Sequence, residues 1–573
     1  MSPEKKRQKK FGAFYTPEKV AEFLAKWSIR TKDDLVLDPG SGEGIFMEKA
    51  FERIHNFGLD SKSSKKHVFG VEYDKLAFEK LRAQFKGYTV LNSSFFNLKP
   101  DNSNQDKNNL PLVDAVIGNP PYIERERLEG VDAIRRRINS TNLGLHLHTV
   151  TDVYGYFLIH ATNFLKDNGR LAFIISDSWL NMNFGKALKE FLLRHYKITA
   201  IIGFEERVFE DAQVRTILIL AENSPSDNNT VLFIRLRNYH YLEKLHYVLE
   251  GREPVNDEVS ITEIDQEKLD PNDSWGTYLK ASPQYFEIIS KPIITPLREL
   301  ADIGIGLQSL KNNFYILEKE RVNELQLEKK FFREIVMSPR GCPLVIQNKK
   351  EIQDFVLYCD NPHHDLKNTK LLEYIKDAEQ TKVSQRGKTK TVIGFQNIPR
   401  INYTNRNPWY NIVPEIEKRC RGTIILPRRS FKRFFAAWNK AKVVVNDNFV
   451  NIEPKNKSHL MPMLAILNSS FTEYLCRVRS QTYGGGVFDL RPEDVKNLPC
   501  LNLNMISKET LGKLSNAYKK FIGNEGRNKS AIDHIIMKDI LRFKKKELDQ
   551  LYREKDSLVL LASVSNGGPN LQA

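Results

Sequence analysis

The chain has 573 residues, 41% of them hydrophobic and 28% charged, which is enough for at least two globular domains. It has no apolar run of membrane-spanning length, and its first ten residues are polar and basic rather than a secretory signal, so we expect a cytoplasmic protein without a membrane partner. The five cysteines lie far apart without a C-x-x-C pair, which predicts reduced core thiols and neither a disulfide framework nor a bound metal.

The net charge of +16 is concentrated in one part of the C-terminal half. Residues 382–442 carry fifteen Lys or Arg and two Glu, a net charge of +13. Such a surplus predicts a polyanionic partner. Aromatic residues alternate with these charges, which favours a folded surface that contacts phosphates over a disordered tail. They are Tyr403, Trp409, Tyr410, Phe431, Phe434, Phe435 and Trp438.

Short apolar runs alternate with helical patterns from Asp34 to Glu222, which is typical of a doubly wound α/β domain. We predict a helix at Tyr154–Leu165 and buried parallel strands at Leu35–Leu37, Val68–Val71, Ala115–Ile117 and Leu171–Ile175. At Ser224–Asn229 the composition changes to Ser, Pro, Asp and Asn, and the alternation ends. We therefore expect a first domain at residues 1–225, a linking stretch at 226–290 and a mixed α+β domain at 291–573.

The last part of the chain, residues 507–558, has a Lys/Glu-rich helical pattern. This pattern is interpreted as a solvated or capping helix rather than a dimerisation coil, so we expect a monomer.

A glycine-rich turn follows the first predicted strand and precedes a predicted helix that starts near Ile45. Its segment, Val36 to Gly44, has the spacing G-x-G-x-G and places Asp38-Pro39 before the first glycine, unlike the G-x-G-x-x-G of dinucleotide sites. An acidic side chain at a strand tip suits a ligand with a cationic amino-acid end, such as S-adenosylmethionine (AdoMet), better than a pyrophosphate. Glu72, at the end of the next strand, is interpreted as the acceptor for two ribose hydroxyls, with a solvated strand cap as the alternative.

The strand at Ala115–Ile117 leads into the loop Gly118-Asn119-Pro120-Pro121-Tyr122. Consecutive prolines stiffen this loop and direct carbonyl oxygens outward. Methylation of an exocyclic amine such as adenine N6 requires acceptors for both amino hydrogens, because the nitrogen lone pair is delocalised into the ring. The Asn119 side-chain oxygen and the Pro120 carbonyl are the predicted acceptors. The alternative interpretation is a rigid turn in which Asn119 caps a helix.

Four segments in this order resemble the gamma-class, TaqI-like DNA adenine-N6 methyltransferases of restriction–modification systems: Phe14–Pro17, Asp38–Gly44, Glu72 and Asn119–Tyr122. The resemblance extends to about Glu222, and Asn-Pro-Pro-Tyr is its most specific element. It implies a class I AdoMet-dependent methyltransferase fold with a mostly parallel, seven-stranded sheet, followed by a C-terminal α+β target-recognition domain. It also implies methyl transfer from AdoMet to adenine N6 in a specific double-stranded DNA sequence, with a separate cognate restriction endonuclease as a possible partner.

The resemblance also assigns roles to individual residues. Asn119 and Pro120 hold N6, Tyr122 stacks on a flipped adenine, and Phe209 contacts that base edge-on. Residues at strand ends and in the loops line the AdoMet pocket: Thr16, Asp38, Pro39, Gly40, Ser41, Gly42, Glu72, Ser94, Phe95 and Pro121. Ser94 stands where the family usually has Asp, so we expect Phe95 to supply more of the contact with the AdoMet adenine, and cofactor affinity to be modest.

Target recognition is expected in the C-terminal half. DNA contacts are predicted for Arg428, Arg429, Lys432 and Arg433, with Arg386, Lys388, Lys390 and Arg406 as further candidates, and most of them should contact phosphates rather than bases. The stretch Tyr483–Phe488 is either a loop that approaches DNA or an ordinary glycine hinge. Lys5–Lys10 is either a phosphate-binding arm or a disordered tail.

Three other functions are open. Enzymes that methylate a glutamine amide or an RNA guanine also carry Asn-Pro-Pro-Tyr, but they are usually shorter, and the positive charge after residue 222 favours DNA. A fused nuclease would normally precede Tyr15–Pro17, where only some ten residues stand, and the C-terminal half has no convincing P-D…(D/E)-x-K motif. A DNA-binding protein without activity is disfavoured by the complete set of catalytic residues.

Overall fold

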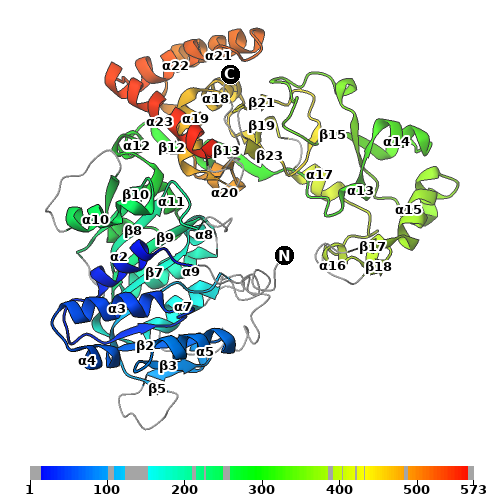
Figure 1. Ribbon diagram of the computed structural model, residues 1–573. Coiled ribbons are helices and arrows are strands. Elements are labelled where there is room, and N and C mark those ends of the chain that lie inside the picture. Colours follow the sequence, from blue (N-terminus) through cyan, green and yellow to red (C-terminus); the bar gives the residue numbers. More distant parts are fainter. Residues whose placement is uncertain are drawn as a thin grey trace. The chain divides into compact units, whose positions relative to one another are not determined.

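The computed structural model describes residues 15–100, 109–122, 134, 153–182, 184–209, 215–224, 228–249, 259–384, 391–402, 404–419, 422–430, 433–482 and 488–564. The chain forms two compact units, Met1–Pro283 and Gln284–Ala573. Figure 1 shows the elements of each unit, coloured along the sequence. Within the described ranges, no helix combines the length and the apolar character that a membrane crossing needs.

A nine-stranded sheet forms the centre of the first unit, in the order β11-β10-β8-β9-β7-β6-β1-β2-β3. Strand β9 lies antiparallel to its neighbours β7 and β8, and β11 lies antiparallel to β10. The other neighbouring strands are parallel. The strands are β1 (Val36–Asp38), β2 (Val68–Glu72), β3 (Thr89–Asn92), β6 (Val113–Gly118), β7 (Leu165–Ser176), β8 (Lys197–Phe204), β9 (Thr216–Glu222), β10 (Thr230–Leu236) and β11 (Val259–Asp265); β4 (Lys99–Pro100) and β5 (Asn109–Leu110) pair separately. The four predicted strands are confirmed as β1, β2, β6 and β7.

This sheet has two strands more than the seven implied by the resemblance, because β10 and β11 extend its edge beyond β8. Both extra strands come from the stretch that the sequence analysis placed between the domains, and the first unit continues to Pro283. The apolar residues of β10 alternate between the two sides of the sheet, with Val231 and Phe233 on one side and Ile234 and Leu236 on the other. The polar composition at Ser224–Asn229 therefore marks a connection between two strands of one sheet.

Helices cover both faces of the sheet (Figure 1). Apolar residues of α2, α3, α5 and α10 pack on one face, and those of α7, α8 and α9 pack on the other. The helices are α2 (Glu18–Ser28), α3 (Ile45–Asn56), α4 (Ser61–Lys66), α5 (Lys75–Gln84), α7 (Val153–Thr162), α8 (Ser178–Asn181), α9 (Gly185–His195), α10 (Leu242–Leu249) and α11 (Gly276–Lys280). Helix α7 confirms the helix predicted to start near Tyr154.

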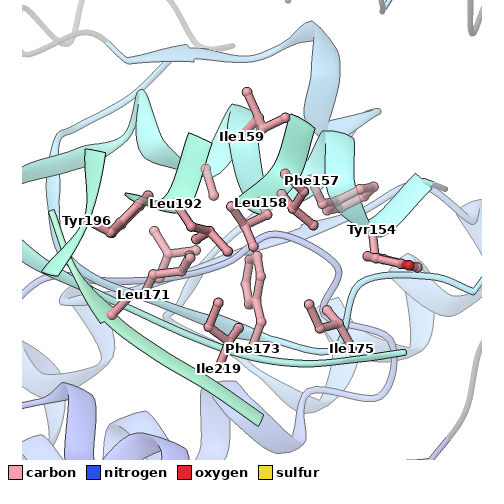
Figure 2. Packing of buried hydrophobic residues seen from close by; sticks show 14 of the residues in the cluster. Tyr154, Phe157, Leu158, Ile159, Leu171, Phe173, Ile175, Leu192, Tyr196 and Ile219 are labelled. Carbon is pink, nitrogen blue, oxygen red and sulfur yellow. The ribbon is translucent and has the colours of Figure 1, made fainter. Parts of the chain in front are cut away.

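The alternation of side chains along a strand explains why the buried strands are apolar throughout. In β7, Ala172 and Ile174 face the α2 side, whereas Leu171 and Phe173 face the α7 side. Figure 2 shows the core on the α7 side of the sheet, in which Leu158 of α7 and other apolar side chains lie over Phe173. Both faces being buried makes the sheet a rigid platform for the loops at its edge.

The second unit consists of small sheets and helices. It has two four-stranded sheets, β13-β23-β19-β21 and β14-β16-β15-β22, a three-stranded sheet, β20-β25-β24, and the pairs β12-β26 and β17-β18. The strands are β12 (Ile294–Pro296), β13 (Ala301–Ile305), β14 (Ile316–Glu318), β15 (Phe332–Val336), β16 (Asp354–Leu357), β17 (Lys382–Ser384), β18 (Thr391–Ile393), β19 (Ile424–Pro427), β20 (Arg429–Ser430), β21 (Ala437–Trp438), β22 (Val444–Val445), β23 (Phe449–Pro454), β24 (Gln481–Thr482), β25 (Phe488–Asp489) and β26 (Pro499–Leu501). This mixed architecture is the predicted α+β class.

Helices lie between these strands and form the end of the described chain. They are α12 (Pro283–Ile289), α13 (Asn312–Tyr315), α14 (Lys319–Glu324), α15 (Lys370–Gln380), α16 (Pro399–Asn402), α17 (Val413–Arg419), α18 (Leu460–Leu467), α19 (Ser470–Arg479), α20 (Pro492–Lys496), α21 (Lys508–Gly523), α22 (Ser530–His534) and α23 (Lys545–Val564). The helical pattern at 507–558 is thus confirmed, although it is divided into α21, α22, a π turn at Ile535–Ile540 and α23.

The aromatic residues of the basic stretch contribute mainly to the interior of the second unit. Tyr410, Phe434 and Phe435 are buried, whereas Tyr403 and Phe431 lie outside the described residues. The described part of the basic stretch is therefore folded, and its rings are used mainly for packing. Four cysteines, Cys342, Cys359, Cys476 and Cys500, are buried and free as expected, and Cys420 lies outside the described residues.

Candidate active site

Hydrogen bonds of Ser41 hold the turn after β1 against β2. The backbone N–H of Ser41 donates to the Val71 carbonyl (2.9 Å), and its hydroxyl donates to the Asp38 carbonyl (3.1 Å) and accepts from the Val71 N–H (3.1 Å). Gly70 permits this approach, because a Cβ there would lie 2.8 Å from Ser41 Oγ and 2.5 Å from Met47 Sδ. The turn is thus held against the sheet, with Asp38 at the strand tip.

Asp38 is a buried carboxylate with one unsatisfied oxygen. Its residue is 1% exposed; Oδ1 accepts from the Gly40 N–H (3.2 Å), and Oδ2 has no hydrogen-bond partner among the described residues. Burial raises the pKa of Asp38 to about 8, and the nearby charge of Glu72 adds to the shift. An unpaired buried carboxylate is costly, so the site fits a cationic group such as the ammonium of an amino-acid ligand.

Glu72, at the end of β2, connects the glycine-rich turn to the loop that follows β2. Its Oε2 accepts from the Gly42 N–H (2.8 Å), and its Oε1 accepts from the Asp74 N–H (2.7 Å). Burial raises the pKa of Glu72. Each carboxylate oxygen accepts more than one hydrogen bond, so the side chain can still receive ribose hydroxyls. The ribose role stays a prediction.

The loop after β3 is anchored from the α7 side of the sheet. Ser94 is half-buried, and Phe95 is 2% exposed, with its ring packed against Phe157 and Phe164. The Phe95 carbonyl is also hydrogen-bonded to Nε2 of His160 (3.1 Å). The Phe95 ring therefore belongs to the core as well as to the site edge, and its expected contact with the AdoMet adenine stays a prediction.

The loop after β6 lies beside the glycine-rich turn. A Cβ on Gly118 would be 3.1 Å from Asp38 Oδ1, and a Cβ on Gly40 would be 4.0 Å from the Asn119 carbonyl oxygen. The Asn119 side-chain Nδ2 donates to Thr16 Oγ1 (3.1 Å), and the following Pro120 is buried. Because β1, β2 and β6 are parallel, their carboxyl ends meet at one edge of the sheet, which is where α/β proteins bind ligands.

Two aromatic side chains stand at the end of this loop. Half-buried Tyr122 donates its hydroxyl to the Ile174 carbonyl of β7 (3.2 Å), and burial raises its pKa well above the usual value. The rings of Tyr122 and Phe209 have centroids 6.2 Å apart and planes at 70°, so they meet edge to face and form an aromatic corner. The structure thus brings the predicted pair together, although 87 residues of sequence separate them.

The predicted DNA-contacting arginines differ in their surroundings. Arg428 forms a bidentate salt bridge with buried Asp489, in which Nε donates to Oδ1 (2.7 Å) and a terminal nitrogen donates to Oδ2 (3.2 Å). Arg429 is more open, with a side chain 54% exposed and Nε 3.5 Å from Asp489 Oδ2. Arg433 donates to the Cys342 carbonyl (2.9 Å). Lys432, Arg386, Lys388, Lys390, Lys5–Lys10 and most of Tyr483–Phe488 lie outside the described residues.

Arg406, another candidate, is an interior residue. Its side chain is 5% exposed, and Nε donates to Glu415 Oε1 (2.8 Å). Its guanidinium also lies 5.4 Å from the centre of the Tyr315 ring. Arg406 therefore stabilises the second unit. The acidic partners of these arginines were not predicted, since nothing in the local sequence marks Glu415 or Asp489 as ion-pair partners.

One further residue of the site, and one contact between predicted residues, were not predicted. Gly70 was not singled out, although a glycine inside a buried strand signals a close approach of other atoms. The contact between Thr16 and Asn119 spans 103 residues and leaves no sequence signal.

Comparisons with known proteins agree with this architecture. Residues 3–253 match the model of the N-6 DNA Methylase family, and residues 280–536 match that of the Type II methyltransferase M.Eco57I, C-terminal domain. Type II methyltransferase M.AccI of Acinetobacter calcoaceticus is 23% identical over 532 residues, which cover 90% of this chain and 89% of that protein. Type II methyltransferase M.HindII of Haemophilus influenzae is 22% identical over 337 residues, which cover 55% of this chain and 57% of that protein.

A solved structure supports the fold over both units. The Type IIL restriction–modification enzyme MmeI, determined in complex with DNA, has a TM-score of 0.54 at 12% identity, and the match covers 97% of this chain and 73% of that one. The sheet order and the glycine-rich turn define a class I AdoMet-dependent methyltransferase with a C-terminal domain. The first unit matches the N-6 DNA Methylase family and the second matches the M.Eco57I C-terminal domain, and the chain is a DNA methyltransferase of the restriction–modification type.

Proposed function

We propose that this methyltransferase is specific for adenine and methylates N6 within a defined double-stranded DNA sequence, protecting that DNA from a cognate restriction endonuclease. One observation carries the proposal. The loop Asn119–Tyr122 lies beside the turn that bears Asp38, and Tyr122 and Phe209 form an edge-to-face aromatic corner at the end of that loop. Hydrogen-bond acceptors for an amino group, a site for a cation and an aromatic corner that can receive a base thus lie together.

The residues at the sheet edge fit AdoMet. The buried Oδ2 of Asp38 receives the ammonium group, and Glu72 receives the ribose hydroxyls. Bound AdoMet supplies a methyl group on a sulfonium, which needs no further activation. The remaining lining residues are Thr16, Pro39, Gly40, Ser41, Gly42, Ser94, Phe95 and Pro121.

The catalytic loop makes the amine more nucleophilic by accepting hydrogen bonds from its two N–H groups. The Asn119 side-chain oxygen and the Pro120 carbonyl hold the two N6 hydrogens, which localises the nitrogen lone pair toward the methyl donor. Both acceptors are fixed before the reaction begins, because buried Pro120 stiffens the loop and Thr16 holds the Asn119 side chain. Positioning then supplies much of the rate.

The adenine must leave the DNA stack to reach this loop, at a cost of a few kcal/mol. Tyr122 offers its ring face to the flipped base, and Phe209 meets the base edge from the side. The hydrogen bond from Tyr122 to Ile174 fixes the ring in place. Base–aromatic stacking contributes about 1–3 kcal/mol, which offsets much of the unstacking cost.

DNA binding outside the site is assigned to the exposed basic residues of the second unit. Arg429 is the best placed of the described candidates, because its side chain is 54% exposed. Lys432 and Arg433 complete the proposed phosphate-contacting group, whereas Arg428 and Arg406 are engaged mainly with acidic side chains. Phosphate contacts set affinity and position, while base contacts set the sequence read.

The test is Asn119→Ala, measured as transfer of labelled methyl from AdoMet to duplex DNA, RNA and protein in parallel. We expect the wild type to label adenine in DNA, and the variant to lose about 100-fold or more in turnover, equivalent to roughly 3 kcal/mol, while AdoMet binding is kept. Retention of more than about a tenth of the activity would contradict the role of Asn119. Labelling of RNA or of a protein glutamine instead of DNA would replace the proposed substrate.

A further inference from the structure

The segment Tyr15–Glu18, here called the N-terminal strap, is tied to both loops of the site. The Tyr15 hydroxyl donates to Glu43 Oε1 in the glycine-rich turn (2.7 Å), and Thr16 Oγ1 accepts from Asn119 Nδ2 in the catalytic loop (3.1 Å). At its end, Glu18 pairs with Lys49 of α3 (2.5 Å). The strap therefore has a fixed path, and Thr16 is held opposite the catalytic amide.

The two ends of the Asn119 amide have opposite hydrogen-bonding roles. Its oxygen accepts, whereas its NH2 group only donates. An adenine N6 amino group is itself a donor to this residue, so only the oxygen end is productive, and two facing NH2 groups would leave both unsatisfied. Because Thr16 accepts from the nitrogen end, the oxygen end is turned away from the strap.

The contact also matters when a base is bound. A flipped base excludes water from the amide, and a desolvated NH2 group needs an acceptor in the protein. Thr16 Oγ1 supplies that acceptor at 3.1 Å. Both ends of the amide are then satisfied in the productive orientation, the nitrogen by Thr16 and the oxygen by N6.

We propose that Thr16 is a positioning residue that sets the orientation of the Asn119 amide, in addition to the place in the AdoMet pocket that the resemblance gives it. This inference rests on the proposed role of Asn119. The hydroxyl acts through Asn119 and not on the reacting atoms. Removing the hydroxyl while keeping the shape of the side chain that lines the AdoMet pocket should therefore lower kcat and leave the affinity for AdoMet nearly unchanged.

The experiment compares Thr16→Val, which keeps the shape and removes the hydroxyl, with Thr16→Ser, which keeps the hydroxyl. We expect Thr16→Val to lower kcat about tenfold, the range of one hydrogen bond, and Thr16→Ser to stay within about twofold of wild type. The dissociation constant of AdoMet, measured calorimetrically without DNA, should change by less than about twofold in both variants. A loss of AdoMet affinity as large as the loss of kcat would overturn the proposal in favour of a cofactor role.

A double-mutant cycle separates positioning from a general effect on the site. In the Asn119→Ala background, Thr16→Val should lower the residual methyl transfer by less than about twofold, because the amide that it positions is absent. An additive tenfold loss would overturn the inference. Tyr15→Phe is the matched control, since it removes the bond to Glu43 and leaves the Thr16 hydroxyl in place.

The control and the parent variant give distinguishable outcomes. If Tyr15→Phe lowered kcat as much as Thr16→Val, the position of the whole strap would be the cause, and the amide role of Thr16 would be rejected. If Asn119→Ala itself retained activity, the proposed function of Asn119 would fail first. If Asn119→Ala is inactive and Thr16→Val matches wild type, only the inference about Thr16 fails.

Discussion

Replacing Asp38 by Asn should stabilise the cofactor-free protein and weaken cofactor binding. The carboxylate is 1% exposed, and burial raises its pKa from an ordinary value near 3.8 to about 8. Between these two values the folded protein holds a proton that the unfolded chain has released. The contribution of Asp38 to stability therefore becomes less favourable as pH rises from about 4 toward 8, and it levels off above 8.

The size of the effect follows from the shift. A displacement of about four pH units corresponds to about 6 kcal/mol at pH 8 or above, since each unit is worth about 1.4 kcal/mol. The variant amide nitrogen replaces an oxygen that has no partner among the described residues, and burying it without an acceptor costs about 1–3 kcal/mol. We expect Asp38→Asn to be more stable than wild type by about 3–5 kcal/mol at pH 8, and less stable by about 1–3 kcal/mol near pH 4, where the ionisation penalty is absent and the amide cost remains.

The assay is calorimetric unfolding of wild type and Asp38→Asn at pH 4.5, 6.5 and 8, with and without AdoMet. Without AdoMet the variant should melt no higher than wild type at pH 4.5 and higher than wild type at pH 6.5 and 8, with the larger margin at pH 8. With saturating AdoMet the order should reverse at pH 8, because binding stabilises only the protein that retains the carboxylate. A variant that is less stable than wild type at pH 8 without AdoMet, or that AdoMet stabilises equally, would refute the assignment of Asp38.

Two further predictions concern the base and the DNA backbone. With 2-aminopurine at the target adenine, Tyr122→Ala should reduce the fluorescence gain and lower turnover about tenfold, whereas Tyr122→Phe, which keeps the ring and loses the hydroxyl that donates to Ile174, should stay within about threefold. Equal signals in wild type and Tyr122→Ala would remove the stacking role. Arg429→Ala should reduce the slope of log affinity against log salt by about 0.9 and leave stability unchanged. Arg428→Ala should instead lower stability by about 2–3 kcal/mol in urea unfolding, because it removes a partner of buried Asp489. If Arg428→Ala reduced the salt slope and Arg429→Ala did not, Arg428 would be the residue that contacts phosphate.

The central strands were predictable because their local sequence has one interpretation. Strands buried on both faces are continuous apolar runs, as at Leu171–Ile175, and turn signals bound them. Strand β10 has an equally clear apolar run at Val231–Ile234, but it follows the polar stretch at Ser224–Asn229, which was interpreted as a domain boundary. A polar connection inside a sheet and a polar linker between domains have the same composition, so only the pairing of β10 with β8 distinguishes them.

In the candidate site, too, some features were predictable from the sequence and others were not. Asp38, Glu72 and Asn119 were predicted because each follows a recognisable parallel strand, and such strands end at a common edge. The contacts that hold them were not predictable, because each joins distant parts of the chain. Asn119 and Thr16 are 103 residues apart, and Arg428 and Asp489 are 61 apart. Composition records that a basic residue is present and says nothing about its partner.

The net charge of the recognition unit therefore overstates the number of phosphates that it contacts. Among the described arginines of residues 382–442, the side chains of Arg406 and Arg428 are 5% and 17% exposed, and each is hydrogen-bonded to an acidic side chain. Arg429 lies 3.5 Å from Asp489, but its side chain is 54% exposed. An arginine held by a carboxylate displaces few counterions from DNA, so it adds little to the salt slope, in which each phosphate contact contributes about 0.9. The measured slope should fall well below the value that a net charge of +13 would give if every cation met a phosphate. The interior arginines instead fix the small strands on which the exposed ones are carried, as the Arg428–Asp489 contact joins the start of β20 to the end of β25.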